Sequence, residues 1–101
     1  MNLYVILRRN GWATPADLEA AGARSAAEGD KPDSGVRWIR SYALAEESGE
    51  VGTVCIYEAD SPETIRAHAR RVGMPADEIT PVLDTVIVRP DPVVVEAGAQ
   101  A

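Results

Sequence analysis

The sequence predicts an α+β fold in which two helices cover one face of a four-stranded antiparallel sheet. Four runs rich in β-branched and aromatic residues are typical of strands. Two segments between these runs open on a hydroxyl residue followed by proline, Thr14-Pro15 and Ser61-Pro62, which is a start signal for a helix. A length of 101 residues suits one domain with a single modest core.

The first third of the chain predicts a strand and a helix. The strand is expected over Leu3–Arg8, and the turn dipeptide Asn10-Gly11 closes it. The helix begins at Pro15 and runs to about Ala27, with only a thin apolar stripe. A polar loop over Gly29–Gly35 then leads to the second strand.

The centre of the chain predicts a β-hairpin. Its strands, Val36–Ala45 and Thr53–Ala59, are joined through a tight turn at Ser48-Gly49, where glycine supplies a positive φ. This turn predicts three cross-strand pairs, which are Tyr42 with Cys55, Arg40 with Tyr57, and Trp38 with Ala59. Because side chains alternate between the two faces of a strand, these six residues are expected on the same face of the sheet.

The last third predicts a helix, a strand and a tail. The helix ends at Gly73, and its inner face carries four residues at helical spacing: Ile65, His68, Ala69 and Val72. A turn over Met74–Asp77 precedes the fourth strand, which is expected within Ile79–Arg89 and starts after Pro81 because proline cannot donate to a ladder. The chain therefore divides into a domain over residues 1–90 and a tail over residues 91–101 that is either flexible or adds an edge.

This order of elements is that of the ferredoxin-like βαββαβ sandwich. Two helices cover one face of such a sheet and leave the other face bare. On the predicted register the bare face carries Trp38, Tyr42 and Tyr57, which is too much aromatic surface for a small domain to leave in water. We therefore expect a homodimer of the dimeric α/β-barrel type, with a pocket between the sheets or between sheet and helices.

Composition excludes several classes of function. A formal net charge of −6 argues against a nucleic-acid partner, because phosphate binding needs a basic surface. The single cysteine cannot form an internal disulfide. The N-terminal segment lacks the pattern of a signal peptide, and no apolar run is long enough to cross a membrane. A cytoplasmic protein is the expectation.

His68 and Cys55 are the only histidine and the only cysteine, so they are the first candidates for chemistry. A histidine on the inner side of a helix is most often a packing residue, and a cysteine within a strand is most often a small buried hydrophobe. The functional alternative pairs His68 with Glu58, which would orient the imidazole for acid–base work or for metal ligation. Arg40, next to Tyr42 on the same face, is the electropositive neighbour that a reactive thiolate needs.

Four segments resemble, in the same order, those of a family of small bacterial proteins described as nickel-binding or nickel-responsive, once catalogued as a domain of unknown function. The segments are Trp38-Ile39-Arg40-Ser41-Tyr42, Cys55-Ile56-Tyr57-Glu58-Ala59, His68-Ala69, and Gly73 to Ile79. The resemblance extends roughly over Val36–Val88. It implies a ferredoxin-like fold, a homodimer and nickel as the bound ion.

The chain departs from the family pattern at two positions. Arg40 stands where relatives carry a histidine, and Leu7 stands where they carry a glutamate. Neither arginine nor leucine ligates a transition metal. The ligand set that remains is His68, Glu58 and Cys55, with Tyr42 or Asp84 as further donors.

Three functions are consistent with these residues. The first is a small nickel-binding protein whose ligands are His68, Glu58 and Cys55. The second is a cofactor-independent enzyme, similar to an isomerase, cyclase or monooxygenase, or a binder of an apolar or aromatic molecule. There His68 with Glu58, or Arg40 with Tyr42, would move protons. The third is a structural dimerisation module. The sequence leaves open whether the protein is an enzyme.

Overall fold

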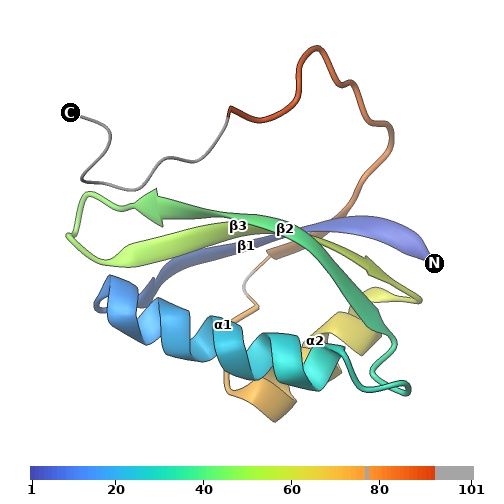
Figure 1. Cartoon of the computed structure of the whole chain (residues 1–101), viewed down its shortest axis with the longest axis horizontal. Helices are drawn as coiled ribbons and strands as arrows, with labels where there is room; N and C mark the ends of the chain where they lie inside the picture. The colour runs from blue at the N-terminus through green and yellow to red at the C-terminus, as the bar shows by residue number, and fades with distance from the viewer. Residues whose placement is uncertain (77, 93–101) are drawn as a thin grey trace.

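The computed structural model of this protein describes residues 1–76 and 78–92. Its elements are β1 (Asn2–Trp12), α1 (Pro15–Gly29), β2 (Val36–Ala45), β3 (Val51–Ala59), α2 (Pro62–Val72) and β4 (Glu78–Pro81). The antiparallel sheet has the strand order β2-β3-β1-β4, and both helices lie on one face of it (Figure 1). The predicted ferredoxin-like fold is confirmed. From residue 93 onward the predicted tail lies outside the described residues, as does Asp77 of the predicted turn.

Both helices begin where the hydroxyl-proline pairs predict. Thr14 accepts a hydrogen bond from the Asp17 amide at 3.2 Å, and Ser61 accepts one from the Thr64 amide at the same distance. Gly73 ends α2 in the left-handed conformation, with φ of +71°. Among the described residues, no helix has the length and apolar character that a bilayer-spanning segment requires.

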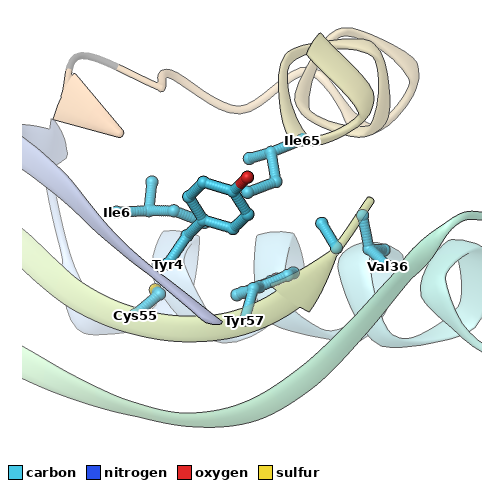
Figure 2. Packing of buried hydrophobic residues seen from close by; sticks show 7 residues of the cluster. Tyr4, Ile6, Val36, Cys55, Tyr57 and Ile65 are labelled. Carbon is cyan, nitrogen blue, oxygen red and sulfur yellow. The ribbon is translucent and has the colours of Figure 1, made fainter. Parts of the chain in front are cut away.

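The core lies between the sheet and the helices. Tyr4 and Ile6 of β1 and Cys55 of β3 point from the sheet toward this layer, where they meet Ile65 of α2 (Figure 2). The inner face predicted for α2 is confirmed, because its four predicted residues are all buried. Burial of this apolar stripe is what holds a helix of three turns on the sheet.

The predicted register of the hairpin is wrong for two reasons. The pairing is already shifted by one residue at the turn, where Ala45 is opposite Val51, and β2 contains a bulge between Trp38 and Arg40. Trp38 is opposite Tyr57, Arg40 is opposite Ile56, and Tyr42 is opposite Val54. The extra residue reverses the side-chain alternation of β2, so Trp38 faces the helices, as Tyr57 of β3 does. Of the three aromatic residues predicted on the bare face, only Tyr42 lies there.

Two strand ends also differ from the prediction. β1 continues past Asn10-Gly11 to Trp12 through an irregularity at which Asn10 adopts a φ of +50°. β4 ends at Pro81 rather than starting after it. Because β4 is an edge strand that pairs only with β1, a proline without an amide hydrogen is tolerated there.

Residues 82–92 form no helix or strand and lie over the face of the sheet opposite the helices (Figure 1). The Val82 amide donates to the Leu3 carbonyl at 2.9 Å. Further along, the Asp91 carboxylate accepts hydrogen bonds from Arg40 at 2.9 Å and from Tyr42 at 2.7 Å. These contacts place an irregular segment where a second layer of helices would lie in a three-layer fold.

Gly35, just before β2, provides a test of the packing between loop and helix. Its φ is +73°, and a Cβ atom there would lie 2.6 Å from Cγ2 of Thr64. We expect Gly35→Ala to lower the free energy of unfolding by at least about 3 kcal/mol, from the left-handed conformation and the clash together. Gly49→Ala is the control, because Gly49 has a φ of +88° with nothing within 4 Å.

In urea denaturation the control variant should lower the free energy of unfolding by only about 1–2 kcal/mol, because it adds the left-handed conformation without a clash. Thr64→Ser removes Cγ2 and keeps the hydroxyl that lies 3.0 Å from Ser61, so it should recover part of the loss in Gly35→Ala. Equal costs for the two alanine variants would contradict the packing described here.

Candidate functional site

Three polar side chains from three different elements meet beneath the sheet. The Ser25 hydroxyl of α1 lies 2.9 Å from the Tyr57 hydroxyl of β3 and 3.1 Å from Nε2 of His68 on α2. All three residues are buried. The rings of Tyr57 and His68 lie 6.0 Å apart at an angle of 55°. We call these residues the Ser25–Tyr57–His68 cluster.

Local structure brings the cluster together. Tyr57 follows the period-two alternation of β3, on the same side as Cys55. His68 lies one turn after Ile65 on the inner face of α2. Ser25 lies one turn after Ala21, and these two are the buried positions of α1. Small residues on α1 let the helix approach the sheet closely enough for the hydroxyl groups to bond.

The cluster carries no net charge at neutral pH. Burial lowers the pKa of His68 below its usual value of 6.5, and the positive charges of Arg71 and Arg8 lower it further. Nδ1 of His68 has no partner among the described residues, so an imidazolium would leave a second N–H buried and unpaired. Burial also raises the pKa of the Tyr57 hydroxyl above 10. The cluster therefore offers neutral donors and acceptors.

A cavity of about 350 Å³ lies beside the cluster, between α1 and the β2–β3 side of the sheet. It is lined by Leu18, Glu19, Gly22, Ser25, Trp38, Ser41, Ala43, Thr53, Cys55, Tyr57 and Met74. Trp38 stacks on Tyr57 with ring centroids 6.1 Å apart and planes within 16° of parallel. The walls are mainly apolar, and the hydroxyl groups of Ser25 and Tyr57 supply polar atoms, which is the usual composition of a small-molecule site.

The residues predicted for a site lie on both sides of the sheet. His68 belongs to the cluster, and Cys55 is a buried free thiol that lines the cavity. Glu58 follows Tyr57 in β3 and so points to the opposite face, where it pairs with Arg37 at 3.2 Å. The predicted pairing of Glu58 with His68 is not present. Ser25 takes that place beside the imidazole.

Arg40 and Tyr42 form a second group on the face away from the helices. Both donate to Asp91, and the hydrogen bond from Tyr42 followed by that from Arg40 lowers the pKa of the Asp91 carboxyl. Residues 82 and 84–91 form one wall of a groove here, and Leu3, Val5, Ile39 and Ile56 are part of the other. Asp84, the further metal donor named from the sequence, lies in the same groove. This group is separated from His68 and Cys55 by the sheet.

The donors in residues 1–76 and 78–92 of one copy do not fit nickel. Among the described residues there is no group of three or more histidine, cysteine, aspartate or glutamate side chains that could hold a metal ion. A first-row transition ion needs several such donors converging at about 2 Å. His68, Glu58 and Cys55 do not form such a group, because Glu58 faces away from the other two.

Two residues of this region, Ser25 and Arg8, were not among the predicted site residues. Arg8 continues the inward-facing alternation of Tyr4 and Ile6 in β1 and is fully buried. Ser25 lies four residues after Ala21, on the thin inner stripe that the sequence predicts for this helix. The spacing of both residues is visible in the sequence, but their polar contacts are not.

Residues 4–82 of the chain match the protein family described as "Nickel responsive protein SCO4226-like". The chain belongs to this family. The solved structure of SCO4226 from Streptomyces coelicolor A3(2) is similar to this chain, with a TM-score of 0.67 and 25% sequence identity. The match covers 83% of this chain and 99% of that chain. No curated protein matches the chain. The family predicted from the residues is confirmed.

The buried imidazole predicts a pH dependence of stability. The pKa of His68 is lower in the folded protein than its ordinary value. Below about pH 6.5 the unfolded chain therefore binds a proton at this residue that the folded chain does not bind. We expect the free energy of unfolding to fall by up to about 1 kcal/mol as the pH is lowered from 6.5 to 5.5. Urea denaturation at several pH values measures this slope.

His68→Gln is the matched variant, because glutamine can still bond to Ser25 but does not titrate. Its stability should be nearly constant over the same interval. Carboxyl groups whose pKa is lowered, such as Glu28 and Asp91, lose their contribution only at lower pH and stay outside this window. Parallel slopes for the two proteins would show that His68 is not the titrating group.

Proposed function

We propose that this member of the nickel-responsive family binds a small organic molecule in the cavity between α1 and the β2–β3 side of the sheet, and that it works as a homodimer. The cavity is the observation that carries the first part of this proposal. It combines apolar walls with a neutral hydrogen-bonding cluster at one end. Sites of this composition orient a ligand by few polar contacts and gain affinity from apolar burial.

The walls suit a flat apolar molecule. Trp38 and Leu18 supply aromatic and aliphatic surface from β2 and α1, and Met74 supplies a flexible side chain from the loop after α2. The Trp38 indole is fixed by a hydrogen bond from Nε1 to the Ser41 hydroxyl at 2.8 Å. A wall held in this way loses little side-chain entropy when a ligand binds.

The polar end suits a ligand with a hydroxyl, carbonyl or carboxyl group. Ser25 and Tyr57 line the cavity, and neutral His68 lies behind Ser25, with Nε2 3.1 Å from its hydroxyl. A proton released by a ligand could pass through the Ser25 hydroxyl to Nε2 of His68. This is the one proton-transfer route that the cluster supports, and binding does not require it.

Nickel binding is the second candidate, and the description of the family as nickel responsive favours it. In the described part of one copy the donors do not converge, so this candidate depends on donors beyond those that these residues bring together. His68 and Cys55 remain its predicted ligands on the helix side, with Glu58 across the sheet.

One titration separates the two candidates. We expect two-ring aromatic compounds to shift the indole N–H resonance of Trp38 in NMR spectra, with dissociation constants in the micromolar to millimolar range. Gly22→Leu should weaken binding at least about tenfold, because a side chain at Gly22 starts 3.8 Å from the Trp38 ring and fills the cavity. Ala23→Leu places a leucine on the exposed side of α1 and should leave binding unchanged.

Nickel chloride belongs in the same experiment. A resonance shift produced by nickel and by no aromatic compound would replace the first candidate with the second. A protein that responds to neither, yet self-associates, would be a dimerisation module.

The homodimer is supported by apolar surface on the face away from the helices. Ile39 and Tyr42 are each 42% exposed there. The family match ends at residue 82. The segment after it adds four large exposed apolar side chains, Leu83, Val86, Ile87 and Val88. Continuous apolar surface of this kind on a small protein marks an interface. A second copy placed on it buries the same residues twice, as a two-fold contact requires.

Sedimentation equilibrium at micromolar concentration tests the dimer. The wild-type chain is expected to sediment with twice its mass of 10.8 kDa. Ile39→Glu should shift the equilibrium toward the monomer by at least about tenfold, because it buries an unpaired charge in the interface. Arg66→Gln changes the net charge by the same amount on the helix side and should have no effect. A wild-type chain that stays monomeric would remove this part of the proposal.

A further inference from the structure

The guanidinium group of Arg8 is a buried charge with an incomplete set of partners. Arg8 is 0% exposed, and its Nε donates to the Pro75 carbonyl. Its two terminal nitrogens, Nη1 and Nη2, have no partner among the described residues. The ion pairs found in the described part of the chain do not include Arg8. A buried cation without a counter-charge is costly, so such groups are usually paired.

A second unpaired polar atom lies next to it. Thr53 of β3 is directly opposite Arg8 of β1, so both side chains point to the helix side from adjacent strands. The Thr53 hydroxyl is buried and also lacks a partner among the described residues. A guanidinium fork beside a hydroxyl group presents several donors in the arrangement that binds a carboxylate through two oxygens.

Thr53 connects this pair to the cavity. Its side chain is part of the cavity lining, together with Cys55 and with Met74, which precedes the residue whose carbonyl holds Arg8. The positive charge of Arg8 also acts on Tyr57 and His68: it offsets part of the rise that burial gives to the pKa of Tyr57, and it adds to the lowering of the pKa of His68 that burial and Arg71 produce. Arg8 is therefore electrostatically part of the polar end of the cavity. The one carboxylate in the lining, Glu19, is exposed to solvent at its edge.

We propose that the ligand of this cavity is a small organic acid. Its carboxylate binds Arg8 and Thr53, and its apolar body lies between Trp38, Leu18 and Met74. This inference rests on the proposed function and names the chemical class of the ligand. Because Nη1, Nη2 and the Thr53 hydroxyl are buried in this structure, Met74 and Thr53 change rotamer when the acid enters. Methionine in a loop is well suited to such a movement.

A matched pair of probes tests the inference. 2-Naphthoate and 2-naphthamide have the same shape, and only the first carries a charge. Calorimetric titration of the wild-type chain at pH 7.5 and low salt should show the acid binding about 10- to 100-fold more tightly, which is the range expected for hydrogen bonds to a charged group. The amide measures binding to the apolar walls alone.

Arg8→Met is the decisive variant. It should reduce the affinity for naphthoate to that for naphthamide and leave the amide unchanged. The variant is expected to fold, because removing a buried unpaired charge is neutral or stabilising. Arg24→Met is the control, since Arg24 also donates from Nε to a carbonyl, that of Val72, but is not paired with Thr53 of the cavity lining as Arg8 is. Thr53→Val should weaken the binding of the acid several-fold and gives a second measurement that leaves Arg8 in place.

The outcomes separate this inference from the proposed function. Equal affinities of acid and amide for the wild-type chain would overturn the inference while the cavity remains a binding site. A preference for the acid that survives in Arg8→Met would overturn it as well. If neither probe shifts the Trp38 resonance at millimolar concentration, the proposed function fails and the inference fails with it.

Discussion

The hydrogen bonds at the Ser25 hydroxyl join every layer of this fold. One hydroxyl group contacts Tyr57 from the sheet and His68 from the second helix, while its own residue belongs to the first. Each of these polar groups would be costly to bury alone. Together they pair almost completely, which fixes how far α1 and α2 stand from the sheet. The cavity exists beside this cluster because small residues on α1 leave space that the cluster does not fill.

The two faces of the sheet have different chemistry as a result. The helix side holds the buried histidine, the thiol and a buried arginine, within apolar surroundings. The opposite side holds Glu58 paired with Arg37, and Asp91 bound by Arg40 and Tyr42. Within one copy of the chain, the sheet separates Glu58 and Asp91 from His68 and Cys55. Function on the helix side and self-association on the other side are therefore compatible.

Much of the fold follows from local signals in the sequence. The caps at Thr14 and Ser61, the stop at Gly73 and the inner face of α2 each depend on a few neighbouring residues, and the structure has all of them. The order of elements then leaves few alternatives to the ferredoxin-like arrangement. The family could be predicted for the same reason, because each segment that resembles the family is contiguous in the sequence.

The register and the site depend on information that is not local. A bulge at Ile39 leaves no mark in composition, yet it moves Trp38 to the helix side and reverses the reading of β2. Pro81 was predicted to precede the strand, whereas it ends β4. An edge strand tolerates proline, but the edge position of β4 is known only once the sheet is assembled. Arg8 and Ser25 were not chosen as site residues, because the burial of a polar residue depends on what packs against it. Glu58 was expected beside His68, and strand alternation placed it on the other face.

The bulge in β2 also bears on how this protein could diverge from its relatives. Removing one residue from this strand would turn Trp38 outward and bring a different side chain to the wall of the cavity, without any substitution. Strand length, rather than side-chain identity, would then govern ligand choice within the lineage. Comparing close homologues by gaps in this strand would consequently be more informative than comparing them by the residues they share.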